Sequence, residues 1–467
     1  MRFDEHFLRG ALSEVTIAQS SFPDDARFSV DTRTLQEGDI FVALSGAQTD
    51  GHQFLEQALS KGAAGLFITD AYLKQVQTLD AIKLRGKLLI SVPDTLHALT
   101  RMASVWRTQF DYPVVAITGS VGKTSTKEML ANILNGNGTT CLASYGNQNT
   151  RIGLSLNMLR MRSHHKAAIF EVGINKRGEM AELARMLNPT TAIITNIGHC
   201  HMEGLGSLAD IALEKRDIFK YFTEESIGII NGDQAVLANV GYVHPVIKFG
   251  SKTVNQIQAR KVSVQNNTLQ CTLKIYKAKY TIILNHAHEG ALYNTLAAAA
   301  AAQLLGVSND AIVQGIQTPP VVTGRFESRL LKGNKGILIN DCYNANPESM
   351  KAALLAFQRM ETKAQKIAIL GDMLELGVTS PFWHRQIGRF LRKVPSLRRV
   401  ILVGDMVQWT RKMIPVGVDV ELVPTWKEAV KLLEDALDAE SVVLVKGSQG
   451  IQLNNLVHAV TETPVAR

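Results

Sequence analysis

The sequence predicts an α/β protein of three domains with a mostly parallel sheet at the centre of the chain. A length of 467 residues suits about three domains of roughly 150 residues each. From residue 113 onward, apolar runs that end in glycine or polar residues alternate with helical patterns, as in doubly wound sheets. One of these runs leads into a glycine-rich loop and then a helical stretch. Hydrophobic residues at 46% and charged residues at 20% are proportions typical of soluble globular proteins.

Residues 1–110 are expected to form a small α/β domain. Strand-like runs at 39–44 and 88–92 lie between helical patterns such as the one at 54–61.

Residues 111–317 are expected to form the central domain. Buried-strand runs at 114–117, 167–173, 191–198 and 226–233 predict a parallel sheet, whose ligands gather at the carboxyl ends of the strands. Between 259 and 284 the apolar period changes to two, which predicts an antiparallel flap before an alanine-rich helix at 293–305.

Residues 318–467 are expected to form a Rossmann-like third domain. The run Thr318-Pro319-Pro320 breaks the preceding pattern and marks the boundary. Four further strand runs, at 337–341, 366–372, 399–405 and 441–448, alternate with helical stretches. Because no G-x-G-x-x-G opening is present, a second-substrate role is preferred to a dinucleotide role.

The loop TGSVGKTS at 118–125 predicts ATP binding. Its glycines let backbone N–H groups point at phosphates, and the helix that follows adds its positive end. Lys123 is expected to reach the outer phosphates and Thr124 to hold Mg²⁺. The loop is a short form, because Ile117 stands where the general pattern has a glycine. The predicted nucleotide residues of the loop are Gly119, Ser120, Val121, Gly122, Lys123, Thr124 and Ser125.

Two side chains at strand ends are candidates to complete a magnesium site with Thr124. Glu171 ends one strand run and His201 follows another, at the sheet edge where the loop opens. A solvated glutamate and a hydrogen-bonding histidine are the alternatives. Zinc is not expected at 199–201, because the sequence nearby holds no further ligand cluster.

Composition restricts the location and the partners. The N-terminus has acidic residues where a signal peptide has a basic and then an apolar run, and no apolar stretch approaches the roughly 20 residues of a membrane span. We therefore expect a cytoplasmic protein without membrane partners, with four reduced and mostly buried cysteines. The net charge of +8 favours anionic partners, but the dispersed Lys and Arg do not indicate nucleic acid.

Several long motifs resemble the Mur ligase family over all three predicted domains. Besides the loop and residues 29–54, they are GNQNT at 146–150, EVGINKRGEM at 171–180, TNIGHCHMEGLGS at 195–207, IALEKRDIF at 211–219, DCYNANPESM at 341–350 and GDMLELG at 371–377. The last two are similar to the member that adds D-alanyl-D-alanine to UDP-N-acetylmuramoyl tripeptide. The resemblance implies an ADP-forming amide ligase of peptidoglycan synthesis, acting through an acyl phosphate, with a third domain that closes over ATP and binds the dipeptide.

The resemblance also implies residue roles. It gives Lys123 the β- and γ-phosphates, and gives Thr124, Glu171, His201 and a carbamylated Lys215 the magnesium environment. Without it, Lys215 is an ordinary helix lysine, because an unperturbed pKa near 10.4 leaves little reactive amine. For ATP it adds Asn294, Arg325, Asp341 and Tyr343. For the UDP-linked substrate and the closing motif it implies Ser29, Asp31, Arg33, Ser45, Asp50, Gly51, His52, Asn147, Asn149, Thr150, Asn344 and Asn346.

The sequence departs from the family at two positions. Tyr293 stands where a histidine is usual and Gln449 where an arginine is usual, so no contact is assigned to either.

Three alternatives stay open. Another amino-acid-adding ligase, including the folylpolyglutamate type, shares the phosphate loop. A nucleic-acid-stimulated motor ATPase fits the basic charge, but the usual pair of carboxylates at a strand end is missing. A nucleotide-gated binding protein would leave Glu171, His201 and Lys215 without a shared purpose. Nothing in the sequence requires more than a monomer.

Overall fold

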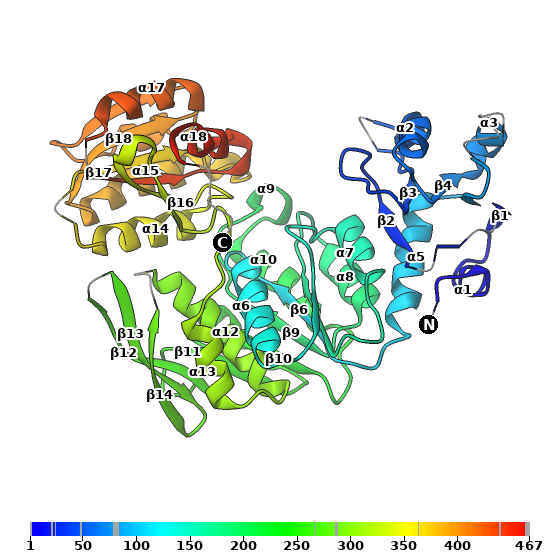
Figure 1. Ribbon diagram of the computed structural model, residues 1–467. Helices are drawn as coiled ribbons and strands as arrows, with labels where there is room; N and C mark the ends of the chain where they lie inside the picture. Colours follow the sequence, from blue (N-terminus) through cyan, green and yellow to red (C-terminus); the bar gives the residue numbers. More distant parts are fainter. Residues whose placement is uncertain are drawn as a thin grey trace. The chain divides into compact units, whose positions relative to one another are not determined.

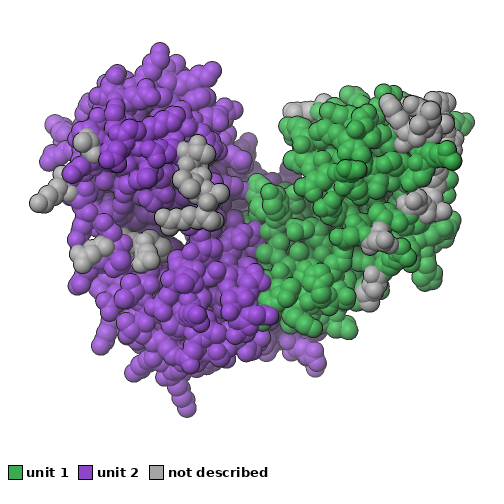
Figure 2. Space-filling view, in the orientation of Figure 1, with its two compact units in different colours: residues 1–116, 139–173, 182–190 green, residues 117–138, 174–181, 191–467 purple. Residues whose placement is uncertain are grey.

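The computed structural model describes the chain except for residues 1, 20–21, 24, 47–48, 78–83, 266, 285–287, 363, 439 and 463–467. The chain divides into two compact units (Figure 2). The first comprises residues 1–116, 139–173 and 182–190, and the second comprises residues 117–138, 174–181 and 191–467. The domain boundaries expected at 110/111 and 317/318 stay a prediction.

The first unit is built on a five-stranded sheet and a two-stranded parallel pair. Its strands are β1 Thr16–Gln19, β2 Arg27–Ser29, β3 Asp39–Val42, β4 Gly65–Thr69, β5 Leu88–Val92, β7 Cys141–Ala143 and β8 Ala167–Glu171. Its helices are α1 Glu5–Ala11, α2 Leu55–Ser60, α3 Leu73–Gln77, α5 Thr95–Arg107 and α7 Arg151–Met158. The sheet order is β1-β5-β4-β3-β2, with β1 antiparallel and the others parallel. β7 pairs with β8, which places Glu171 at a strand end.

Two elements, β6 Val114–Thr118 and α8 Glu179–Leu187, run from one unit into the other along the chain.

The second unit begins with the helix after the phosphate loop and the strands around it. Its first strands are β9 Thr191–Ile194, β10 Ile227–Asn231, β11 Val246–Gly250, β12 Ile257–Gln265, β13 Thr268–Ile275 and β14 Ala278–Leu284. Its first helices are α6 Lys123–Gly136, α9 Met202–Leu205, α10 Leu208–Arg216, α11 Ala235–Ala238, α12 Glu289–Leu304 and α13 Asn309–Gln317. β9 to β12 pair in parallel, whereas β12, β13 and β14 are antiparallel. The predicted mostly parallel sheet with an antiparallel flap is confirmed.

The rest of the second unit is a six-stranded sheet with helices on both faces. Its strands are β15 Glu327–Leu330, β16 Gly336–Asn340, β17 Lys366–Gly371, β18 Leu397–Val403, β19 Asp419–Val423 and β20 Ser441–Lys446. Its helices are α14 Pro347–Arg359, α15 Ser380–Phe390, α16 Gln408–Arg411, α17 Trp426–Ala436 and α18 Leu453–Val460. The order is β15-β16-β20-β17-β18-β19, parallel except for the edge strand β15.

Alternate residues of β17 face two separate cores, as expected for a strand buried on both sides. Ala368 and Leu370 pack with α14 and α15, whereas Ile367 and Ile369 pack with α17 and α18. Figure 1 shows this sheet between α14 and α17. The Rossmann-like prediction is thereby confirmed, although the short edge strands β15 and β19 were not predicted.

Two further features bear on the predictions from composition. All four cysteines are free thiols, three of them buried and Cys141 partly exposed, which confirms the expectation. None of the helices in the described part of the chain is long and apolar enough to cross a membrane.

Candidate active site

The phosphate loop joins β6 to α6, and its two glycines are required by both conformation and space. β6 is buried over its whole length. Gly119 and Gly122 have φ angles of 145° and 88°, values that glycine adopts at low cost. A Cβ atom on Gly119 would clash with Oγ1 of Thr195, and one on Gly122 would clash with Oδ1 of Asn294. The backbone therefore curls as the sequence predicted.

The segment after β9 holds the loop in position. The backbone N–H groups of Ser120 and Val121 donate to the carbonyl oxygen and to Oδ1 of Asn196, at 3.0 and 2.8 Å. Oγ of Ser120 donates to the carbonyl of Gly198 at 2.9 Å and accepts from its N–H at 2.8 Å. Oγ1 of Thr195 donates to the carbonyl of Val121 at 2.6 Å. The TNIG motif at 195–198 is thus the support of the loop.

The start of α6 carries the charged groups of the loop. Gly122 is the N-cap and has no side chain to cap the first N–H groups, so the positive end of the helix faces the loop. Nζ of Lys123 donates to the carbonyl of Gly119 at 2.9 Å, which places the ammonium over the loop. Nη2 of Arg325 lies 3.5 Å from Oγ1 of Thr124. The helix begins at Lys123, inside the loop motif, and polar residues form its first turn.

The substitution Gly122→Ala is expected to weaken nucleotide binding at least tenfold, a loss of about 1.4 kcal/mol or more in binding free energy. The added methyl group must displace the side chain of Asn294, and the alanine must adopt a positive φ. The control is Gly138→Ala, because Gly138 also has a positive φ (76°) but has open space around the added atom. A titration with fluorescent ATP measures both. Equal losses in the two variants would contradict the steric account.

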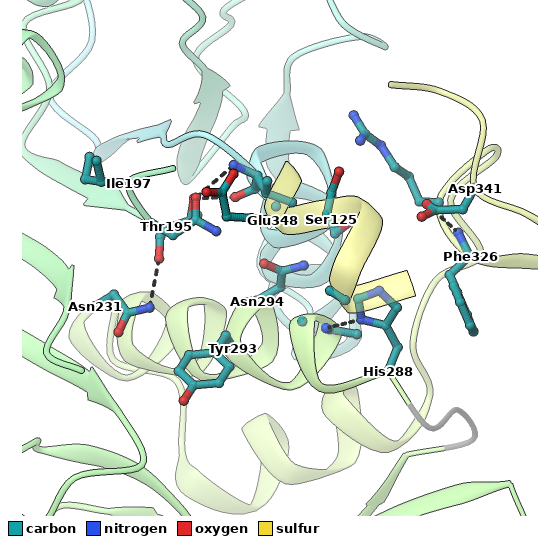
Figure 3. Close-up of a pocket in the computed structure, with 18 of the residues that line it drawn as sticks. Ser125, Thr195, Ile197, Asn231, His288, Tyr293, Asn294, Phe326, Asp341 and Glu348 are labelled. Carbon is teal, nitrogen blue, oxygen red and sulfur yellow. Dashed lines mark hydrogen bonds between the residues drawn. The ribbon is translucent and has the colours of Figure 1, made fainter. Parts of the chain in front are cut away.

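A cavity of about 370 Å³ lies beside the loop (Figure 3). This volume is within the range of small-molecule sites. Asn294 on α12 and Ser125 on α6 both face it, as Figure 3 shows. Its lining includes six of the predicted nucleotide residues, namely Val121, Gly122, Ser125, Asn294, Arg325 and Asp341. The structure therefore brings most of the predicted nucleotide residues together.

Tyr293, which stands where the family usually has a histidine, also lines this cavity. Its hydroxyl donates to Oδ2 of Asp233 at 2.8 Å. Burial raises the pKa of Tyr293 to about 12. Burial alone would raise the pKa of Asp233, but hydrogen bonds from Ser251, Lys252 and Tyr293 outweigh it and hold that pKa at about 2. Tyr293 and Asp233 thus form a fixed pair of a neutral phenol and a carboxylate.

Residues after α13 line another side of the cavity. The guanidinium of Arg325 lies 4.0 Å from the centre of the Tyr343 ring, in a cation–π contact. Oδ1 of Asp341 accepts from the N–H of Phe326 at 3.1 Å, and its Oδ2 pairs with Nζ of Lys446 at 2.8 Å. These contacts orient Arg325 and Asp341, whereas Tyr343 acts on the site through Arg325.

Lys215 is almost fully buried on α10, with a relative exposure of 1%. Its pKa is lowered from 10.5 to about 8, mainly by burial; the nearby charge of Lys123 adds to this lowering, whereas Cys200 and Glu214 oppose it. Sγ of Cys200 lies 3.1 Å from Oγ of Ser120 in the phosphate loop. A lysine with a partly neutral amine therefore lies next to the loop, which helix periodicity alone did not indicate.

Both histidines of the 199–201 segment contact carboxylates. Nδ1 of His201 lies 2.6 Å from Oε2 of Glu375, in the GDMLELG motif. This hydrogen bond is the main reason that the pKa of Glu375 is lowered. Nδ1 of His199 lies 2.5 Å from Oε1 of Glu348. His201 is thus held by a partner that its strand-end position did not reveal, and its part in a metal site stays a prediction.

In the first unit, Glu171 meets one of the predicted substrate residues. Nδ2 of Asn149 donates to Oε1 of Glu171 at 2.7 Å. The backbone N–H of Glu171 donates to Oγ of Ser144 at 3.1 Å. Asn147 and Thr150 lie exposed in the same loop. The roles of these side chains toward a metal or substrate stay predictions.

The remaining first-unit candidates form two local networks. Asp31 and Arg33 are paired at 2.6 Å, and this hydrogen bond lowers the pKa of Asp31. Oδ1 of Asp50 accepts from Nδ1 of His52 at 2.6 Å, and Nε2 of His52 lies 3.0 Å from the N–H of Thr69. Oγ of Ser29 donates to the carbonyl of residue 31, Oγ of Ser45 donates to Asp50, and Gly51 packs against Leu44. Both ring nitrogens of buried His52 are thus engaged within the protein, and the roles of these first-unit residues toward a substrate stay predictions.

The two asparagines of the closing motif have local partners. Oδ1 of Asn346 accepts from the N–H of Ser349 at 2.8 Å and caps α14. Oδ1 of Asn344 accepts from the N–H of Ala345 at 2.8 Å, and its carbonyl accepts from Lys446. Both side chains thus bind backbone N–H groups close to them in the chain, and substrate contacts from them stay predictions.

Several cavity residues were not singled out from the sequence. Asn231 at the end of β10, Asp233 and Gln234 just after it, and Lys446 at the end of β20 line the cavity. Each follows or ends an apolar strand run that had been recognised. The rule that ligands gather at the carboxyl ends of parallel strands would have found them.

Three family models match the chain in sequence. "Mur ligase family, catalytic domain" matches residues 28–107, "Mur ligase middle domain" matches 117–302, and "Mur ligase, glutamate ligase domain" matches 324–449. A UDP-N-acetylmuramoyl-tripeptide--D-alanyl-D-alanine ligase of Bacillus subtilis (strain 168) is 32% identical over 442 residues, 94% of this chain and 93% of the relative. The enzyme of the same name from Treponema pallidum (strain Nichols) is 34% identical, covering 92% of both chains.

Solved structures agree with these matches. The crystal structure of MurF from Acinetobacter baumannii has a TM-score of 0.83 and 26% identity, covering 98% of both chains. The structure of MurF ligase from Thermotoga maritima in complex with ADP has a TM-score of 0.78 and 26% identity, covering 93% of this chain and 96% of that chain. The chain therefore belongs to the Mur ligase family.

Proposed function

We propose that this protein is an ATP-dependent ligase that joins D-alanyl-D-alanine to UDP-N-acetylmuramoyl tripeptide. The product is the UDP-muramoyl pentapeptide used in peptidoglycan synthesis. The observation that carries the proposal is the buried Lys215 beside a phosphate loop whose glycines are sterically required. The curated relatives cited above bear this activity in their names.

The chemistry requires activation of a carboxylate. An oxygen of the tripeptide's terminal carboxylate attacks the γ-phosphorus of ATP, and the bond to the leaving ADP oxygen breaks. The amine of D-alanyl-D-alanine then attacks the carbonyl carbon of this acyl phosphate. The bond between that carbon and the phosphate oxygen breaks, and the amine loses a proton. The products are an amide, ADP and phosphate. Lys123 and the positive end of α6 stabilise the charge that gathers on the phosphate oxygens.

Magnesium is expected to accompany the nucleotide. No three acidic, histidine or cysteine side chains among the described residues form a cage for a metal. Mg²⁺ usually binds through one or two protein ligands together with phosphate oxygens and water, so Thr124 at the loop fits it. Bound there, the ion would neutralise phosphate charge. Glu171, His201 and a carbamate on Lys215 are the further proposed ligands.

A carbamate on Lys215 needs a neutral amine to react with CO₂. At pH 7.5 a lysine of ordinary pKa is neutral in about one molecule in a thousand, whereas one with a pKa near 8 is neutral in about one in four. Carbamylation would replace a buried cation with an anion next to Lys123. Burial, which disfavours the ammonium, thus supports this modification.

The pair of Tyr293 and Asp233 is proposed to shape the nucleotide pocket beside Asn294. The substitution Tyr293→Phe is expected to raise the KM for ATP by about tenfold or more with little change in kcat, because it removes a hydrogen bond to a carboxylate, worth about 1.5–3 kcal/mol. The control is Tyr276→Phe, at an exposed turn position. Steady-state phosphate release measures both. An unchanged KM for Tyr293→Phe would contradict this role.

The direct test of the proposed function is product formation. ATP, Mg²⁺, UDP-muramoyl tripeptide and D-alanyl-D-alanine are combined with the protein, and mass spectrometry detects the pentapeptide nucleotide. Omitting one reactant at a time is the control. Phosphate release that depends on a different amine would identify another amino-acid-adding ligase. Hydrolysis stimulated by DNA or RNA would indicate the motor alternative.

The third residue of the tripeptide is tested by supplying the meso-diaminopimelate and the lysine forms in separate reactions. The cytoplasmic location and the monomeric state are part of the proposal. Analytical ultracentrifugation tests the second.

A further inference from the structure

One segment of this protein is rich in basic residues and holds no acidic residue. Lys and Arg are spread along the chain, but no Asp or Glu occurs between Asp233 and Glu289. Residues 234–288 hold seven of the 50 basic residues and none of the 42 acidic ones, so this segment has a net charge of +7. The segment includes the flap formed by β12, β13 and β14.

Four of these cations converge on one side of the flap. A hollow of about 660 Å³ is lined by Arg260, Lys261, Lys274 and Lys279. Lys274 and Lys279 are directly opposite each other on β13 and β14, and Gln258, two residues before Arg260, is opposite Lys274 on β12. Like charges placed opposite each other on a sheet destabilise it. The arrangement therefore has a cost that an anion would remove.

The flap itself supplies no counter-charge. Over the described residues, no carboxylate lies within ion-pair distance of Lys261, Lys274 or Lys279. The other face of the flap is apolar and buried, with Leu273 and Ile275 in the core. Arg260 is partly structural, because its Nη1 donates to the carbonyl of Ser251 at 2.8 Å. The three lysines are thus the groups available to a ligand.

We propose that this hollow binds a small, multiply charged phosphate compound, separately from the nucleotide cavity. Its volume falls within the range of small-molecule sites. None of its lining residues is aromatic, so it has no platform for stacking the bases of single-stranded nucleic acid. Thr253 and Thr272 add hydroxyl groups that can donate to phosphate oxygens.

The test is a calorimetric titration with inorganic pyrophosphate while ADP fills the phosphate loop. The parent protein is expected to bind with a dissociation constant of about 1 mM or tighter at low salt, and binding should weaken as ionic strength rises. The triple variant Lys261→Gln, Lys274→Gln, Lys279→Gln should bind at least about tenfold more weakly. A control variant with the same change of charge, Lys74→Gln, Lys335→Gln, Lys431→Gln, uses exposed lysines outside the segment and should stay within about twofold of the parent.

The outcomes separate the possible occupants. Equal affinity of the parent and the flap variant would overturn the proposal, as would a parent that binds no pyrophosphate at about 10 mM. A parent that sediments with phosphatidylglycerol vesicles or shifts a duplex RNA, but does not bind pyrophosphate, would show a membrane or nucleic-acid surface instead. Loss of ADP binding with retained flap binding would count against the proposed function alone. Matching melting curves for the two triple variants establish that both are folded.

Discussion

Replacement of Lys123 by alanine is expected to lower kcat/KM for ATP by about 10²–10³-fold. The ammonium of Lys123 is held over the phosphate loop by the carbonyl of Gly119. It lies where it can neutralise phosphate oxygens bound by the loop, and the charge on those oxygens increases as the γ-phosphoryl group is transferred. A coupled phosphate-release assay with UDP-muramoyl tripeptide and D-alanyl-D-alanine measures the loss.

The matched control is Lys335→Ala, which removes an exposed lysine from the same unit. It should leave the rate unchanged. Lys123→Arg keeps the charge but replaces a compact ammonium with a planar group, so only partial activity is expected. Retention of more than about half of the activity by Lys123→Ala, where a loss on the order of a hundredfold is expected, would remove this residue from the catalytic account.

The substitution Lys215→Ala is expected to abolish at least about 99% of the activity, as removal of a group that holds transition-state charge does elsewhere. The parent enzyme should lose activity in buffer depleted of CO₂ and regain it when bicarbonate is added. The variant should respond to neither treatment. If Lys215→Ala matches the parent, and bicarbonate affects neither protein, the carbamate does not exist.

Burial of Lys215 should also change the pH dependence of the unfolding free energy. This dependence tests the lowered pKa of Lys215 independently of activity. Its pKa is about 8 in the folded protein and near 10.5 in the unfolded chain, so the unfolded chain binds more protons between these values. Its cost to folding is therefore absent above pH 10.5, grows as the pH falls toward 8, and is fully present below that. In CO₂-free buffer, Lys215→Met should remove this part of the pH dependence of the unfolding free energy.

The phosphate loop could be predicted closely because its requirements are local. Gly119 and Gly122 have positive φ angles, which glycine adopts readily. Lys123 and Thr124 follow Gly122 directly, so their place at the start of α6 depends only on the local sequence. The parallel strands could be predicted equally well, because each is a short apolar run buried on both faces.

Pairs that form between distant segments could not be predicted. Glu375 pairs with His201 across 174 positions, and Asp233 meets Tyr293 across 60. No local pattern encodes either contact. The edge strand β19 escaped notice because its residues are only partly buried or exposed, so it lacks the continuous apolar run of the central strands. Lys215 shows the same limit, because only tertiary burial distinguishes it from a surface lysine.

The central claim is that the tripeptide's carboxylate is phosphorylated before the amine attacks. The measurement that tests this most directly uses UDP-muramoyl tripeptide with ¹⁸O in its terminal carboxylate, followed by mass spectrometry of the released phosphate. An acyl phosphate predicts transfer of one labelled oxygen to phosphate for each amide formed. Amide formation with unlabelled phosphate would contradict the mechanism.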